Sequence, residues 1–172
     1  PILYGTTHLG NIDDVSAFMF TKKGGMKTPK IVPFDGGGEL ATQLVAGAVN
    51  TAVLNLAEAG SQIDAGDVCP IVVLANERMA GLPNVTTAKE MGIDVSFSTV
   101  RGFAVHKDTP DAIAEKIETA LLKAMNHSIY QGFLQSVGLD STSVVGSDEW
   151  GDQITTMVTD MESALKELGF IE

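Results

Sequence analysis

Three consecutive glycines, Gly36 to Gly38, separate a short apolar segment from a segment with helical periodicity. The apolar segment, residues 30–34, has the length of a β-strand. Beyond the glycines, apolar residues recur at the three- and four-residue spacing of one helix face: Leu40, Leu44, Val45 and Ala48. A strand that enters a helix through a glycine turn points backbone N–H groups and the positive end of the helix dipole outward. The sequence therefore predicts a place where an anion can bind, and the scarcity of reactive side chains favours binding over catalysis.

Segments of strand and helix character alternate through the first part of the chain. Four strands are expected, at residues 2–4, 30–34, 49–54 and 68–75. Helices are expected at residues 13–21, 39–46, 57–63 and 87–91. The β-rich residues 93–105 exceed the typical strand of about five to six residues, so two short strands are expected there. This alternation predicts an α/β fold with a mostly parallel sheet flanked by helices.

Helix signals dominate the chain after about residue 106. Three helices are expected there, at residues 110–124, 129–137 and 147–165. Asp108 or Thr109 is expected to cap the first of them, Pro110 to lie in its first turn, and Ser147 to cap the third. This change of character places a boundary near residues 96–102, so that an α/β part (1–98) precedes a mainly helical part (99–172).

Composition excludes several classes of protein. The formal net charge of −11 and the absence of a basic stripe argue against nucleic-acid binding. No apolar run approaches the ~20 residues that a membrane-spanning helix needs. The single cysteine, Cys69, excludes an internal disulfide and a multi-cysteine metal site, and its apolar surroundings predict a buried, inert thiol. The chain starts at Pro1 without a signal peptide, and we expect it to be a piece of a longer protein.

The loop Gly5–Gly10 follows the first predicted strand, as the glycine turn follows the second. Loops at the carboxyl ends of parallel strands converge on one edge of the sheet, where ligands bind. Thr6, Thr7 and Asn55 are therefore expected to gather beside the three glycines and to offer hydrogen-bond donors to a carboxylate or phosphate. Turns and helix caps use the same residue types without any ligand, and both interpretations remain open.

The remaining polar residues give no catalytic or metal site. The glycines do not form a P-loop, because Glu39 stands where the lysine would be, and Glu58 lies inside a predicted helix rather than at the ribose-binding end of a strand. The histidines have no ligand partner one helical turn away, so no zinc site is expected. His8 alone lies in the candidate site, where it either binds a ligand or is an ordinary surface or capping residue. Asp13 and Asp14 are expected to start a helix, with Asn11 or Asp13 as its cap.

Four segments in the same order resemble one protein family. They are Gly5–Gly10, Val32–Gly37 with Leu44–Asn50, Arg78 with Leu82–Gly92, and Gly102–Pro110. Together they resemble the solute receptors of tripartite tricarboxylate transporters, the Bug family of periplasmic binding proteins. The chain departs from the family pattern at Asn50, usually Asp, at Thr86, usually Pro, and at Asp108, usually Gly. These departures affect packing and turns more than the proposed anion-binding loops.

The resemblance implies a fold and a function. Residues 1–98 would form the second lobe of a type II periplasmic binding protein, residues 99–172 would return to the first lobe, and the first half of the family's chain is missing. A small carboxylate would bind between the lobes, without a cofactor, and be delivered to membrane transporter subunits in the bacterial periplasm. The expected ligand-binding residues are Thr6, Thr7, His8, Asp35, Gly36, Gly37, Gly38 and Asn55. A small enzyme that uses His8 as acid or base, or a sensor module, is the alternative.

Overall fold

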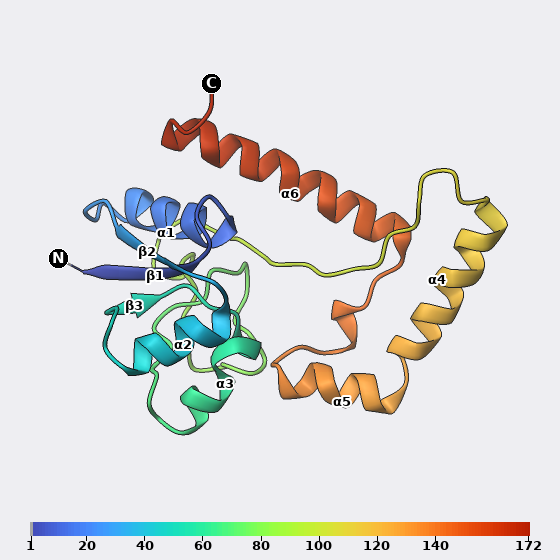
Figure 1. The fold of residues 1–172 in the computed structure, drawn as a ribbon, viewed down its shortest axis with the longest axis horizontal. Helices are drawn as coiled ribbons and strands as arrows, with labels where there is room; N and C mark the ends of the chain where they lie inside the picture. Colours follow the sequence, from blue (N-terminus) through green and yellow to red (C-terminus); the bar gives the residue numbers. More distant parts are fainter. Residues whose placement is uncertain (1) are drawn as a thin grey trace.

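A three-stranded parallel sheet forms the centre of the first part of the chain (Figure 1). The computed structural model describes residues 2–172. The strands are β1 (Leu3–Thr7), β2 (Lys30–Phe34) and β3 (Thr51–Ala52), and both β2 and β3 pair with β1 in parallel. Thr7 lies opposite Phe34 in this register, at the carboxyl ends of their strands. The structure confirms the predicted α/β fold with a parallel sheet.

Helices cover both faces of this sheet. The first three are α1 (Ile12–Lys23), α2 (Gly37–Val45) and α3 (Leu56–Asp64). Figure 1 shows α1 on one side of the sheet and α2 with α3 on the other, as right-handed crossovers in opposite directions require. After a long irregular stretch come α4 (Asp111–Met125), α5 (Ser128–Ser136), the 3₁₀ turn η1 (Ser141–Ser143) and α6 (Ser147–Leu168).

The irregular stretch contradicts several predicted elements. Residues 68–75 form no strand but a single parallel bridge, between Val73 and Thr87. Residues 87–91 form turns rather than a helix, residues 93–105 contain no regular strand, and the strand expected at 49–54 is reduced to Thr51–Ala52. A strand requires a neighbour along its length, and apolar periodicity does not reveal whether one exists. Cys69 lies in this segment and is exposed, so the prediction of a buried thiol is wrong.

The helix ends follow the predictions more closely. Asn11 caps α1, since its side chain accepts hydrogen bonds from the backbone of Asp13 and Asp14. Helix α2 begins at Gly37, two residues earlier than predicted, so two of the three glycines belong to its first turn. The predicted N-caps of α4 and α6 are wrong. Pro110 is the N-cap of α4 in place of Asp108 or Thr109, and Gly146 is the N-cap of α6 in place of Ser147.

Two groups of buried residues hold the first part of the chain together. On one side of the sheet, Leu40 of α2 is fully buried, and its Cδ1 atom lies 2.3 Å from where a Cβ on Gly5 of β1 would be. On the other side, Val15 and Met19 of α1 pack with Val95 and with Ala164 of α6. Helix α6 is therefore part of the core formed by α1.

The C-terminal turn of α6 is fastened to α1 by specific contacts. The rings of Phe18 and Phe170 meet edge to face with centroids 5.3 Å apart. The Nζ atom of Lys22 donates to the backbone carbonyl of Glu167 at 2.5 Å, which satisfies a carbonyl of the last helical turn. In contrast, α4, which the structure describes in full, has no buried residue. The division of the chain at residues 98 and 99 stays a prediction.

An ion pair fastens the loop that follows the bridge at Val73. The Nε atom of Arg78 donates to both carboxylate oxygens of Glu90, at 3.0 and 2.9 Å, and its Nη1 atom donates to the carbonyl of Pro83. The backbone N–H of Thr87 donates to Glu90 at 2.8 Å. The hydrogen bond from Arg78, followed by that from Thr87, lowers the pKa of Glu90 to about 2.

This lowered pKa predicts a dependence of stability on pH. Because the folded chain binds the Glu90 proton more weakly than the unfolded chain, the stabilisation is complete above the ordinary pKa of 4.5 and is lost as the pH falls toward about 2. We expect Glu90→Gln to lower the free energy of unfolding at pH 7, as measured by urea unfolding. The difference in free energy of unfolding between this variant and the wild type should become smaller as the pH approaches 2. Glu77→Gln in the same loop is the control, and an equal effect of both substitutions would contradict the assignment.

Candidate functional site

Two acidic residues at the start of α1 hold the loop that follows β1. The backbone N–H of Thr7 donates to Oδ2 of Asp13 at 3.1 Å, and the Thr7 hydroxyl donates to the same oxygen. The Thr6 hydroxyl donates to Oδ1 of Asp14 at 2.5 Å, and the backbone N–H of Gly10 donates to Oδ2 of Asp14 at 2.7 Å. Asp13 and Asp14 are only 8% and 5% exposed, so these bonds are largely shielded from water. The two acids therefore shape the loop as well as start the helix.

The two threonine hydroxyls are consequently engaged within the protein. A hydroxyl has one proton to donate, and both donate to aspartates. Thr6 is also fully buried. The pattern of two threonines followed by two aspartates was visible in the sequence, but acids are so common in first helical turns that it indicated only helix capping. The structure thus reveals a support for the loop that sequence reasoning missed.

The backbone of the loop adopts an unusual conformation at His8. Its φ of 54° is the only positive φ of a non-glycine residue in the part of the chain that the structure describes. This left-handed conformation costs about 1–2 kcal/mol for a residue with a side chain, so the surroundings must hold it. The N–H of His8 donates to the carbonyl of Phe34 at 2.9 Å, which ties the loop to the end of β2. The His8 side chain is exposed.

The glycine turn presents the uncapped start of a helix. Gly36 is the N-cap of α2 and, as a glycine, supplies no capping side chain. Glu39 does not replace it, because its carboxylate accepts from the N–H of Asp35, outside the helix, at 3.1 Å. The first N–H groups of a helix have no partner within the helix, so those of Gly37 and Gly38 can bind an anion or water. Gly37 is buried, whereas Asp35 and Gly38 are exposed.

Glu58 connects this turn to the start of α3. Its Oε2 atom accepts from the backbone N–H and the side-chain amide of Asn55, at 2.8 and 3.2 Å. A Cβ on Gly37 would lie only 2.2 Å from Cδ of Glu58, so the absence of a side chain at Gly37 lets the two helix starts meet. The sequence drew attention to Glu58 only as a possible ribose ligand, and its capping role follows from its position three residues after Asn55.

The predicted residues lie at the carboxyl edge of the sheet. Thr7 is beside Phe34, the glycine turn follows Phe34 directly, and Gly37 contacts Glu58, which holds Asn55. The charged groups on this chain of contacts are acidic: Asp13, Asp14, Asp35, Glu39 and Glu58. A bound carboxylate would thus depend on backbone N–H groups rather than on a cation. No cluster of side chains in residues 2–172 is suited to hold a metal ion. That these residues bind a ligand stays a prediction.

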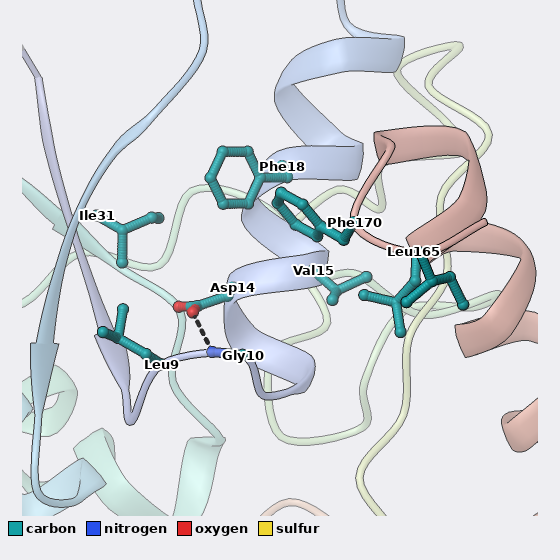
Figure 2. A pocket seen from close by; sticks show the side chains of 9 residues that line it. Leu9, Gly10, Asp14, Val15, Phe18, Ile31, Leu165 and Phe170 are labelled. Carbon is teal, nitrogen blue, oxygen red and sulfur yellow. Dashed lines mark hydrogen bonds between the residues drawn. The ribbon is translucent and has the colours of Figure 1, made fainter.

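An apolar cavity lies beside the same loop, between α1 and the end of α6 (Figure 2). Its volume is about 460 Å³. Figure 2 shows Leu9 and Ile31 on one side and the ring of Phe170 near Phe18 on the other, with the hydrogen bond from Gly10 to Asp14 beside Leu9. Most of the residues that line the cavity are apolar. Asp14 is the charged residue of the lining, and both of its carboxylate oxygens already accept hydrogen bonds from the loop. This cavity requires α6 to lie over α1, which the sequence did not predict.

Comparison with known proteins matches nearly the whole chain to one family profile. The family is described as "Tripartite tricarboxylate transporter family receptor", and residues 2–168 match. A UPF0065 protein of Agrobacterium vitis is 30% identical over 125 residues, which are 72% of this chain and 36% of that protein. A UPF0065 protein of Bordetella pertussis is 30% identical over 110 residues, 63% of this chain and 34% of that protein. The chain spans about a third of the length of these curated relatives.

Solved structures share the fold at lower sequence identity. A Rhodopseudomonas palustris protein with adipate has a TM-score of 0.85 and 19% identity, over 98% of this chain and 56% of that one. MatC from the same species, with bound malate, has a TM-score of 0.74 and 22% identity, over 95% of this chain and 56% of that one. The periplasmic binding protein BugD has a TM-score of 0.76 and 18% identity, over 98% of this chain and 56% of that one. No helix within residues 2–172 is long and apolar enough to cross a membrane.

Proposed function

The chain belongs to the tripartite tricarboxylate transporter receptor family, and we propose that it forms part of a solute receptor that binds a small carboxylate. The observation that carries the proposal is the uncapped start of α2 beside the strained loop at His8, on one edge of a parallel sheet. Proteins of this family are receptors rather than enzymes, so the alternative that used His8 as a catalytic acid or base is set aside.

In this proposal, the backbone N–H groups of Gly37 and Gly38 and the side chain of His8 contact the ligand carboxylate. Thr6 and Thr7 support the loop through Asp14 and Asp13, and Asp35, Gly36 and Asn55 form the rim of the site. A helix N-terminus stabilises a negative charge within its first turn, which offsets the repulsion from nearby acids. The relatives with adipate and malate support a small dicarboxylate as the ligand class. Its second carboxylate would lie away from the acidic edge formed by Asp35 and Glu58.

The other wall of the site would come from the part of the family fold that this chain does not span. Residues 1–98 would be the second lobe, and residues 99–172 would return to the first lobe, although the C-terminal end of α6 packs on α1 of the second. Large apolar side chains on the C-terminal helices support this arrangement, because several are strongly exposed: Ile113, Ile129, Phe133 and Val158. Closure of the two lobes would trap the carboxylate and present it to membrane transporter subunits in the periplasm, where the relative BugD acts as a binding protein.

The first part of the test is ligand-induced stabilisation of the full-length protein that contains this chain. A panel of mono-, di- and tricarboxylates is compared with the corresponding amides in a thermal unfolding assay. A ligand at a hundred times its dissociation constant stabilises the folded state by about 2.7 kcal/mol, which raises the melting temperature measurably. If no acid in the panel raises it, the proposal is wrong.

A substitution at the N-cap of α2 makes the test specific to the site. Gly36 has an extended backbone, and a Cβ there meets nothing within 4 Å, so Gly36→Asp fits and supplies a capping carboxylate. We expect this variant to be at least as stable as the wild type but to bind the carboxylate at least about tenfold more weakly, because its own carboxylate takes the N–H groups. Gly36→Ala fits equally well and cannot cap, so it should retain binding. Unchanged affinity in Gly36→Asp would place the ligand elsewhere.

A further inference from the structure

Two glycines from distant parts of the chain touch at the end of α5. Gly138 follows α5 with a φ of 76°, and Gly81 lies in the loop that Arg78 and Glu90 fasten. A Cβ on Gly81 would lie 2.7 Å from Cα of Gly138 and 2.8 Å from Cδ2 of Leu56. A Cβ on Gly138 would lie 2.4 Å from the same Leu56 atom. The two backbones are therefore in direct contact, and Leu56 packs over both.

This contact lies next to the candidate site. Leu56 is the first residue of α3 and follows Asn55 directly. Glu58 in the same turn holds Asn55 and packs against Gly37. A change in how closely α5 approaches Leu56 would therefore act on the residue next to Asn55, which belongs to the rim of the proposed site.

Few other buried contacts hold this part of the helical region in place. Helix α4, described in full, has no buried residue, and in α5, also described in full, only Leu134 is buried. The connection over residues 101–108 is exposed throughout. Figure 1 shows α4 and α5 extending away from the sheet, with the end of α5 returning toward α3. A segment with so few buried contacts changes position at low cost in free energy.

We propose that Gly81, Gly138 and Leu56 form a stop that sets how closely the α4–α5 arm (residues 111–138) approaches the sheet. The absence of side chains at both glycines permits the short separation, and the fastened loop makes Gly81 a firm surface. Movement of this arm relative to the sheet is part of lobe closure, so the importance of the stop for ligand binding rests on the proposed function. The stop itself depends only on the contacts among Gly81, Gly138 and Leu56 and not on ligand binding.

The matched substitutions follow from the space around each glycine. In Gly81→Ala, the new Cβ must move from 2.7 Å to at least the 3.4 Å of ordinary van der Waals contact with the Gly138 backbone, so the arm must move outward. Leu56→Ala removes the side chain that packs over the contact and adds no bulk. Gly132→Ala in α5 is the control, because a Cβ there meets nothing within 4 Å.

The experiment measures the distance between the sheet region and the arm. Spin labels are attached to the native, exposed Cys69 and to a cysteine introduced as Lys123→Cys in α4, and the distance distribution is recorded by pulsed electron paramagnetic resonance without ligand. We expect a longer mean distance in Gly81→Ala, a broader distribution in Leu56→Ala, and no change in Gly132→Ala. Unchanged distributions in both Gly81→Ala and Leu56→Ala would overturn the proposal.

The distance measurement and the ligand assay fail independently. Because the distances are recorded without ligand, an unchanged distribution leaves carboxylate binding untouched, and a negative ligand panel leaves the stop intact. Circular dichroism of each labelled variant verifies that the helices are retained. If Gly81→Ala does not fold, the Leu56→Ala distribution decides: a broader one supports the stop and an unchanged one overturns it.

Discussion

Replacing Leu40 by alanine is expected to lower the free energy of unfolding by about 2–5 kcal/mol. Leu40 is fully buried between α2 and the sheet, and its Cδ1 atom occupies the space that a side chain on Gly5 would need. The smaller residue would remove apolar surface from the core and leave a cavity against the backbone of β1. Urea unfolding followed by circular dichroism measures the loss.

Val45→Ala is the matched control for this substitution. Val45 lies on the same helix but is 46% exposed. Its replacement should change the free energy of unfolding by no more than about 0.5 kcal/mol, because surface substitutions seldom do more. Equal losses in the two variants would show that Leu40 does not fill the core as the structure indicates.

Replacing Asp14 by alanine is expected to lower the free energy of unfolding by about 2–4 kcal/mol. Asp14 accepts a hydrogen bond from the hydroxyl of Thr6. Because Thr6 is fully buried, its hydroxyl would lose this acceptor in the variant. The N–H of Gly10 also loses its acceptor, and the first turn of α1 loses a charge that stabilises the helix dipole. Urea unfolding measures the total, and amide hydrogen exchange should show faster exchange through residues 6–10.

Two further variants separate the causes of this loss. Asp111→Ala removes an exposed aspartate from the first turn of α4 and should cost no more than about 1 kcal/mol, the size of the dipole effect alone. Adding Thr6→Val to Asp14→Ala removes the unsatisfied hydroxyl, so the double variant should be more stable than the sum of the single effects predicts. Strict additivity would show that the bond between Thr6 and Asp14 contributes nothing.

A site made largely of backbone donors places few demands on side chains. The N–H groups of a helix start remain in place as long as the strand, the turn and the helix form. These three solved structures retain the fold at 18–22% sequence identity, with TM-scores of 0.74–0.85. In the proposed receptor, neighbouring side chains and the opposite wall, rather than the donors at Gly37 and Gly38, would select among carboxylates.

The predicted elements succeeded where short-range signals were complete. The turn of three glycines and the Asn11 cap mark the starts of their helices because each acts within a few residues of its position. The strand predicted at residues 68–75 failed for the opposite reason. Its apolar run was visible, but strand formation depends on a neighbouring strand, and only Val73 finds a bridging partner in the described chain.

The candidate site was predictable in position but not in its bonding. Parallel strands bring their loops to one edge, so the proximity of Thr7, the glycine turn and Asn55 followed from the order of elements. The acceptors of the threonine hydroxyls did not follow, because Asp13 and Asp14 satisfy the sequence pattern of a helix start whether or not they bond to the loop. The contact of Glu58 with Gly37 was equally hidden, since it joins two helices.

The α/β fold, the parallel sheet, most helix ends and the glycine turn before α2 could be predicted from the amino-acid sequence. These features depend on periodicity, turn residues and caps, which act between residues close together in the chain. The packing of α6 on α1, the exposure of Cys69 and the contact between Gly81 and Gly138 became visible only in the folded chain. Each of these depends on which distant segments come into contact, and that choice reflects the packing of the whole chain rather than any local pattern.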